Sequence, residues 1–464
     1  MKRLKKLLRK LMSSELLKDK KFLKNIGKLF GASFVSQLVP FIILPFLTRM
    51  YSPDDFGFWA YFLSLSGILS IFMTGNYEFA IILPKEEKEA VNLATGSIIL
   101  TAFVFLLCLP ASLILSTTIL KNAGIQSKDY SFVLLICLMA LFMALFRIMN
   151  YWNNRKNRFH RTALGSITRS VSGSTIQFIR GLNPMRDYMG LISGSILGYF
   201  AGTAVQSKDF VSAVVKNKKK ISVKSIRESL IRYKDFPKYF MPSEFMNNLS
   251  SNVPVIFLTN MFDSAAAGLY SIPQKFINIP LTMLGSSISQ VYYKKATDLK
   301  NSNEDISKIT TDIYKKLLVL GIFPLSIVAG YGDYIFSIFL GEKWEVSGLY
   351  AALLAPWMLM VFASSPISII FATLEKQKTS LKLNFFLLII RLAAFIVGGI
   401  VFESAFIAVM LYGASGFIYW LYLSFFIIKT VGGDKLEIMK FTVIRLCFIM
   451  LPIIISRMVF EWIM

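Results

Sequence analysis

Long apolar runs without charge alternate with short charged segments along this chain of 464 residues. Runs such as Leu29–Leu47 and Ala90–Leu120 hold no charged side chain, and about 20 such residues cross a bilayer as a helix. The pattern predicts an all-α integral membrane protein of about twelve transmembrane helices. The predicted spans lie near 26–49, 57–83, 91–118, 130–150, 162–180, 188–206, 239–260, 266–293, 311–332, 348–373, 381–401 and 404–428.

Three segments outside or within these spans have a distinct pattern. Residues 1–24 place leucines on one helical stripe among basic residues, which is typical of an amphipathic helix on the inner membrane surface or of a basic tail that enforces topology. Residues 431–464 contain one short uncharged run, so they form an interfacial helix or, if the flanking arginines snorkel, a thirteenth span. The first span contains Pro40 and Pro45, which predict a bend or hinge.

A short motif occurs twice. Leu47–Trp59 aligns without a gap with Leu258–Tyr270, and Gly57 matches Gly268. Apolar runs flank both copies, so the motif is predicted to be the turn between the first two helices of a repeated unit. Such duplication is a recurring plan of secondary transporters. We therefore expect six-helix bundles at 25–206 and 239–430, joined by a basic cytoplasmic linker at 207–238.

The charge distribution sets the expected orientation. The formal net charge is +24, and most Lys and Arg fall in segments that the spans place inside with the N-terminus cytoplasmic. This favours membrane topology over nucleic-acid binding. The three cysteines lie in apolar stretches and His160 is the only histidine, so neither a metal site nor a cofactor is expected. The chain has no Walker A motif, and the short predicted exterior loops argue against an enzyme.

Polar side chains follow one face of several predicted spans. Because lipid would penalise such faces, they predict a water-filled cavity between the halves. The residues expected to line its polar face are Ser271, Asn278, Thr282, Glu244, Asn248 and Ser251.

Four cations fall within predicted spans: Lys275, Arg169, Arg147 and Arg391. Placing a charged side chain within the bilayer costs free energy, so each of these residues is expected to have an ion-pair partner or a function. The functional interpretation is a cationic cavity that binds an anionic head group such as a diphosphate. The structural alternatives are internal ion pairs or, for Arg147, snorkelling to the interface. Glu78 would serve in ion coupling, as a countercharge, or as the ion-pair partner of one of these cations.

Several stretches together carry a family resemblance. Tyr77–Pro84, Ala267–Tyr293 and Trp344–Pro366 resemble the Wzx-type polysaccharide flippases of the multidrug/oligosaccharidyl-lipid/polysaccharide exporter superfamily. Members often have a basic residue where this chain has Asn76, a departure that favours a different sugar. The resemblance implies two bundles arranged as a V around a central cationic cavity. It also implies transport of undecaprenyl-diphosphate-linked oligosaccharide, as in O-antigen biosynthesis, across the bacterial cytoplasmic (inner) membrane.

The prediction is therefore a secondary transporter. Its expected partners are other polysaccharide-assembly proteins such as a polymerase, and its expected state is a monomer. A multidrug or cation exporter of the same superfamily is the main alternative, although four buried cations disfavour it. Two further alternatives are a membrane enzyme of glycan assembly and a non-transporting scaffold.

Overall fold

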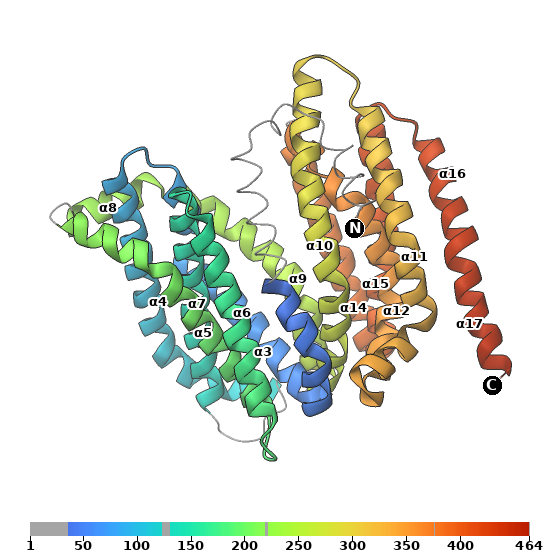
Figure 1. Ribbon diagram of the computed structural model, residues 1–464, viewed down its shortest axis with the longest axis horizontal. Helices are drawn as coiled ribbons and strands as arrows, with labels where there is room; N and C mark the ends of the chain where they lie inside the picture. Colours follow the sequence, from blue (N-terminus) through green and yellow to red (C-terminus); the bar gives the residue numbers. More distant parts are fainter. Residues whose placement is uncertain (1–35, 123–129, 219–220, 375, 464) are drawn as a thin grey trace. The chain divides into compact units, whose positions relative to one another are not determined.

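Helices make up almost the whole of the described chain, and no β-strand occurs within it (Figure 1). The computed structural model describes residues 36–122, 130–218, 221–374 and 376–463. The chain divides into two compact units, Met1–Gly268 and Leu269–Met464. The predicted all-α class is confirmed, while residues 1–24, with their predicted amphipathic segment, lie outside the described residues.

The first unit begins with an apolar helix, Ser36–Met50, that contains both Pro40 and Pro45. The rest of the unit consists of α3 (Pro53–Thr74), η2 (Tyr77–Ile82), α4 (Glu87–Asn122), α5 (Tyr130–Arg155), α6 (Phe159–Gly181), α7 (Tyr188–Lys216), α8 (Val223–Arg232), η4 (Phe236–Phe240) and α9 (Met241–Met261).

The second unit contains most of α10 (Ser264–Asn301), whose first five residues belong to the first unit. Its other elements are α11 (Ser307–Leu340), η5 (Glu342–Trp344), α12 (Glu345–Ser364), η6 (Ser365–Ile367), α13 (Ile370–Thr373), α14 (Gln377–Ile396), η7 (Val397–Val401), α15 (Ala405–Thr430), α16 (Lys435–Arg445), η8 (Leu446–Met450) and α17 (Leu451–Ile463).

Among the described residues, nine helical stretches are long and apolar enough to cross a membrane. α6, α9 and α10 overlap three further predicted spans and carry the polar residues singled out above. The chain is thus a multi-pass membrane protein. The nine stretches are Pro53–Thr74, Glu87–Pro110, Ser131–Arg155, Tyr188–Lys216, Ser307–Leu340, Glu342–Ile367, Lys378–Val401, Ala405–Thr430 and Lys435–Arg457.

Both copies of the repeated motif form a helix-starting turn. Ser52 caps α3, and its Oγ accepts a hydrogen bond from the N–H of Asp55 at 3.1 Å. Asp263 is the equivalent residue of the second copy, and its Oδ1 accepts from the N–H of Ala266 at 2.7 Å. A side-chain acceptor at this position satisfies an N–H that has no partner within the helix. The two copies therefore start α3 and α10 with the same capping geometry.

The segment predicted as a linker, 207–238, is largely helical and forms part of the first unit. It holds the end of α7, the amphipathic α8 and η4. Leu230 of α8 packs into the core that surrounds Trp152 of α5, and the hydroxyl of Tyr77 donates to its carbonyl at 3.1 Å. The candidate span Tyr188–Lys216 extends into the start of this segment, and its role as a linker stays a prediction.

The C-terminal helices run along α11 in the same direction as it (Figure 1). At one end Tyr314 is hydrogen-bonded to Thr442 at 3.0 Å. At the other, the Arg457 guanidinium pairs with the Asp333 carboxylate at 2.5 Å. These contacts lie near opposite ends of α11, and whether the segment forms a thirteenth span or an interfacial helix stays a prediction.

Candidate functional site

A left-handed turn at the end of α3 positions Glu78. Gly75 has φ 56° and Asn76 has φ 58°, a conformation that glycine adopts freely and that asparagine tolerates better than most residues. This turn ends α3 and starts η2, which carries Glu78. The Glu78 side chain is fully buried, so its carboxylate requires a nearby partner.

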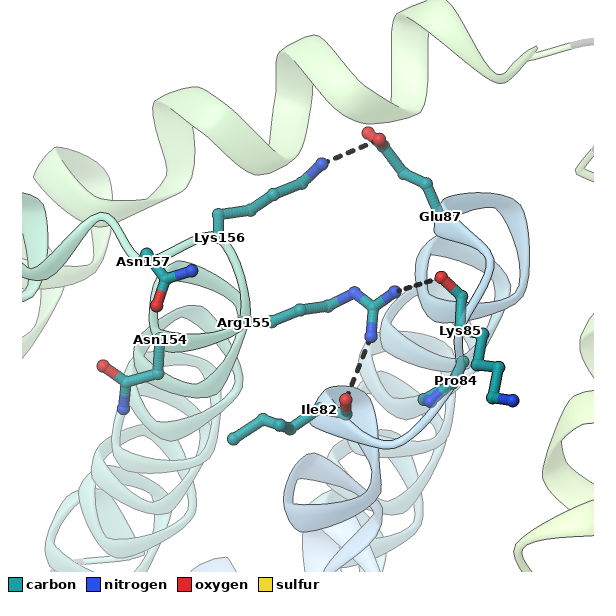
Figure 2. Close-up of a pocket in the computed structure, with 8 residues that line it drawn as sticks. All are labelled: Ile82, Pro84, Lys85, Glu87, Asn154, Arg155, Lys156 and Asn157. Atoms are coloured by element: carbon teal, nitrogen blue, oxygen red, sulfur yellow. Dashed lines mark hydrogen bonds and ion pairs between the residues drawn. The ribbon is translucent and has the colours of Figure 1, made fainter.

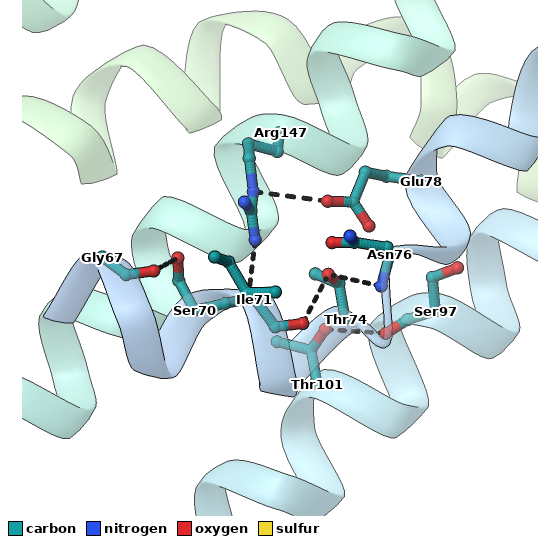
Figure 3. A network of polar contacts seen from close by, with 9 residues as sticks. All are labelled: Gly67, Ser70, Ile71, Thr74, Asn76, Glu78, Ser97, Thr101 and Arg147. Carbon is teal, nitrogen blue, oxygen red and sulfur yellow. Dashed lines mark hydrogen bonds and ion pairs between the residues drawn. The ribbon is translucent and has the colours of Figure 1, made fainter. Parts of the chain in front are cut away.

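That partner is Arg147 of α5 (Figure 3). Its Nε lies 3.4 Å from Oε1 of Glu78, and its Nη2 donates to the Ser70 carbonyl of α3 at 2.6 Å. The Arg147 side chain is 28% exposed, whereas that of Glu78 is 0% exposed. The structure thus joins two of the predicted site residues, in the ion-pair arrangement that the sequence analysis held open.

Further polar groups surround this pair. Both amide atoms of Asn76 are buried and have no hydrogen-bond partner within the described residues, and Figure 3 shows the amide beside the Glu78 carboxylate. Glu244 of α9 acts electrostatically on Glu78. On the same helix, Asn248 accepts a hydrogen bond from Asn252 at 2.9 Å, and Ser251 is exposed. The expected role of these α9 residues in lining a cavity stays a prediction.

Arg169 of α6 lies between aromatic rings. Its Nη1 donates to the Tyr199 hydroxyl of α7 at 2.7 Å, and its guanidinium lies 4.7 Å from the Tyr199 ring centroid and 5.2 Å from that of Phe146. No carboxylate forms a salt bridge with it in the described part of the chain. Within the described residues, the positive charge of Arg169 is therefore stabilised by the faces of two aromatic rings and by the Tyr199 hydroxyl rather than by a carboxylate.

Lys275 of α10 has a buried ammonium group. One turn before it, Ser271 is 4% exposed, and the neighbouring Gln274 donates to the Tyr270 hydroxyl at 3.0 Å. The side chains of Asn278 and Thr282, predicted to continue this polar face, lie outside the described part of the structure.

Arg391 of α14 lies over two aromatic rings in the second unit. Its guanidinium is 5.3 Å from the Trp357 ring of α12 and 5.4 Å from the Tyr412 ring of α15. The predicted cations are thus divided between the units. Arg147 and Arg169 belong to the first, with Glu78, while Lys275 and Arg391 belong to the second. A cavity shared by both halves stays a prediction.

A pocket of about 450 Å³ at the ends of α4 and α5 was not anticipated (Figure 2). Arg155 donates to the Ile82 carbonyl at 3.1 Å and to the Glu86 carbonyl at 3.4 Å, while Lys156 pairs with Glu87 at 2.8 Å. Sequence analysis had assigned this basic segment to topology alone. Because Arg155 binds backbone carbonyls, it holds the loop between η2 and α4 in place.

The protein family described as "Polysaccharide biosynthesis protein" matches residues 46–348 of this chain. Lipopolysaccharide biosynthesis protein WzxC of Escherichia coli (strain K12) is 24% identical over 212 residues, which cover 44% of this chain and 42% of that protein. The aligned stretch therefore spans less than half of that relative.

Solved transporter structures share the fold. The Lipid II flippase MurJ, in an inward closed conformation, gives a TM-score of 0.70 at 17% identity and covers 91% of this chain and 92% of that one. An inward-facing multidrug resistance MATE family transporter gives 0.61 at 12% identity, with coverages of 87% and 94%. These relatives are named as a biosynthesis protein, a flippase and a transporter, in agreement with the expectation that the chain is not an enzyme. The chain belongs to the polysaccharide biosynthesis protein family and has the fold of the MurJ and MATE transporters, as its resemblance to Wzx-type flippases predicted.

Proposed function

We propose that this protein is a secondary transporter that flips undecaprenyl-diphosphate-linked oligosaccharide from the cytoplasmic to the outer face of the bacterial cytoplasmic membrane. The observation that carries the proposal is the family match over residues 46–348. The transporter fold supports it. Transport would supply glycan units for surface polysaccharide biosynthesis.

The buried cations give the proposal its chemistry. A diphosphate requires positive charge, and arginine can bind two of its oxygens at once. Lys275 and Arg169 are the proposed diphosphate ligands, since the Lys275 ammonium is buried and Arg169 forms no salt bridge in the described residues. Arg147 and Arg391 add positive charge for the rest of the head group. The fold shared with MATE transporters also suits a cation exporter, the main alternative. That function would instead need acidic groups to bind the cationic substrate.

Glu78 acts in this scheme as a countercharge. It pairs with Arg147 at 3.4 Å, so a bound anion and the Glu78 carboxylate compete for the same guanidinium. Binding draws Arg147 toward the substrate, and return of Arg147 to Glu78 favours release. A proton taken up by Glu78 would weaken its hold on Arg147 and couple transport to a gradient.

Alternating access then moves the head group across the membrane while the prenyl tail stays in lipid. The two halves rock about the 207–238 connection, and the first helix bends at Pro40 and Pro45. We place the N-terminus in the cytoplasm, on the basis of the positive-inside distribution of charge. The proposed partners are the lipid-linked substrate, membrane lipid and polysaccharide-assembly proteins such as a polymerase.

The test in cells uses the double variant Arg169→Ala with Lys275→Ala. It should abolish surface glycan export because the diphosphate loses both of its proposed ligands. Lys300→Ala is the matched control on the same helix, since Lys300 donates to the Thr373 carbonyl at 2.8 Å and should not contact substrate. Normal export by a well-expressed double variant would contradict the proposed binding scheme.

A further inference from the structure

The pocket at the ends of α4 and α5 has no role in the proposed transport step. It holds about 450 Å³ and belongs wholly to the first unit (Figure 2). One part of its lining comes from the segment around the start of α4, and the other from the end of α5 and the turn after it. The lining residues are Ile82, Pro84, Lys85, Glu87, Asn154, Arg155, Lys156 and Asn157.

Arg155 fixes one wall of the pocket. Its guanidinium donates to the backbone carbonyls of Ile81, Ile82, Lys85 and Glu86, at distances between 3.1 and 3.5 Å. These four acceptors run from the end of η2 to the residue before α4. The chain itself therefore forms this wall before any ligand arrives, as is usual for binding sites.

The pocket carries an excess of positive charge. The three acids of the segment around the start of α4 each form an ion pair, at 2.8, 2.8 and 2.6 Å: Glu86 with Lys88, Glu87 with Lys156, and Glu89 with Arg232. Neither Lys85 nor Arg155 forms a salt bridge within the described part of the chain, and the Lys85 side chain is exposed. An anionic group therefore fits the pocket better than a neutral one.

Two side-chain amides add hydrogen-bond donors. Figure 2 shows the amides of Asn154 and Asn157 without a contact to the other residues drawn. Asn157 has φ 53°, a left-handed conformation that asparagine tolerates better than most residues. Each amide carries two N–H donors, and phosphate oxygens accept hydrogen bonds from amides as well as from cations. The pocket thus offers both charge and donors to a phosphate group.

The pocket also has an apolar border at the level where two spans end. Ile82 and Leu83 are 45% and 57% exposed, and the candidate spans of α4 and α5 begin at Glu87 and end at Arg155. The expected orientation places these ends at the cytoplasmic face. Basic pockets between spanning helices on that side bind the head groups of anionic lipids. A phospholipid contacts the apolar border as well as the charge, whereas a soluble phosphate uses the charge alone.

We propose that this pocket binds the phosphate head group of an anionic phospholipid from the inner leaflet. Lys85 and Arg155 supply the positive charge. Asn154 and Asn157 donate to the phosphate or glycerol oxygens, and Ile82 packs on the glycerol end of the acyl chains. The inference goes beyond the proposed function and does not depend on it, because this lipid is a component of the membrane and not the transported substrate.

A lipid in this pocket also affects the candidate site. Arg155 binds two carbonyls at the end of η2, the element that carries Glu78. Arg147, the partner of Glu78, lies about two turns before Arg155 on α5. A lipid that immobilises the pocket therefore also stabilises the Glu78–Arg147 pair.

The test is photolabelling of the purified full-length protein in phosphatidylcholine nanodiscs. The probes are phosphatidylglycerol and phosphatidylcholine, each with a photoreactive diazirine at the start of one acyl chain. Phosphatidylglycerol should label the wild-type protein at least about tenfold more, because two cations of the pocket have no carboxylate partner. The label should lie within residues 82–87 or 154–157. Lys85→Gln together with Asn157→Gly removes one charge and one amide while glycine keeps the left-handed backbone, and it should lower the preference about fivefold.

Lys88→Gln together with Asn303→Gly is the matched control. Lys88 lies in the same segment but does not line the pocket, and Asn303 has the same φ of 53° as Asn157. This control should keep the full preference for phosphatidylglycerol. Thermal unfolding of each variant verifies that it is folded.

The possible outcomes separate the lipid site from its alternatives. Equal labelling by the two lipids, phosphatidylglycerol label confined to other segments, or an unchanged preference in the folded Lys85→Gln, Asn157→Gly variant would overturn it. Loss of the label in the presence of equimolar glycerol 3-phosphate would also overturn it, because the ligand would then be a soluble phosphate. Each of these results leaves the flippase proposal intact, since no transport substrate is present in the experiment.

Discussion

Gly57 and Gly268, equivalent residues of the two motif copies, make reciprocal contacts. A Cβ added at Gly57 would lie 1.7 Å from the carbonyl oxygen of Ser264, and one added at Gly268 would lie 2.0 Å from the carbonyl oxygen of Pro53. Pro53 and Ser264 are themselves equivalent positions in the alignment. Each copy thus packs its glycine on the first helical residue of the other, a two-fold arrangement within the first unit. The Ser264 hydroxyl adds a hydrogen bond to the Asp54 carboxylate at 2.6 Å.

This contact predicts that neither glycine can be replaced. Gly57→Ala or Gly268→Ala should destabilise the protein by about 1–3 kcal/mol or more, because the new methyl group meets backbone atoms that cannot rotate away. Thermal unfolding and glycan export should both fall. Gly67→Ala is the control on α3, since its Cβ would meet nothing nearer than Asn248 Oδ1 at 3.8 Å. An alanine at Gly57 that behaves like this control would show that the motif copies do not pack as described.

The Glu78–Arg147 pair predicts an unequal response to the loss of either partner. Arg147→Met leaves a fully buried carboxylate and should cost about 3–5 kcal/mol. Glu78→Gln leaves an arginine that is 28% exposed, so its cost should be smaller, about 1–3 kcal/mol. The double variant should be more stable than Arg147→Met alone. Thermal unfolding of the three proteins checks this order, and the reverse order would mean that Arg147 does not stabilise Glu78.

The contacts of the C-terminal helices predict the location of the C-terminus. Since α16 and α17 run in the same direction as α11, which is expected to leave the cytoplasm, the chain should end outside the cell. A C-terminal alkaline phosphatase fusion should be active and a C-terminal green fluorescent protein fusion dark. Fusions at Thr430, where α15 ends, should show the opposite pattern. A fluorescent fusion at the full-length C-terminus would indicate an interfacial helix instead.

The Asp333–Arg457 pair predicts how this span is held. Both side chains are largely buried, at 9% and 14% exposed, so Asp333→Asn should remove the carboxylate that pairs with Arg457 in the middle of α17. The expected result is greater protease sensitivity of the C-terminal segment and a lower unfolding temperature. Lys315→Gln removes a more exposed pair, with Glu437, and should have little effect. Equal effects of the two variants would exclude Asp333 as the anchor of α17.

The main features of the fold could be predicted because they depend on local pattern. Uncharged runs give the spans, and the repeat correctly marks the helix-starting turns, since Ser52 and Asp263 are both side chains that cap helices. Whether residues 431–464 span the membrane could not be predicted from their short uncharged run. The partner that lets Arg457 remain buried, Asp333, lies on a helix far away in sequence.

The site was less predictable because its geometry depends on tertiary contacts. The sequence identified Glu78 and the cations but not which of them pair. That pairing depends on the left-handed turn at Gly75 and Asn76 and on the approach of α5. The sequence did not identify Trp357 and Tyr412 as neighbours of Arg391, because both lie in apolar runs that also suit contact with lipid. Only folding brings these rings to Arg391.

The most direct test of the account is the transfer of fluorescently labelled undecaprenyl-diphosphate oligosaccharide across vesicles that contain the purified protein. The account predicts that labelled head groups cross faster than in protein-free vesicles, and that the Arg169→Ala, Lys275→Ala double variant is no faster than the empty bilayer. Wild-type protein that leaves the crossing rate at the protein-free level would contradict the central claim.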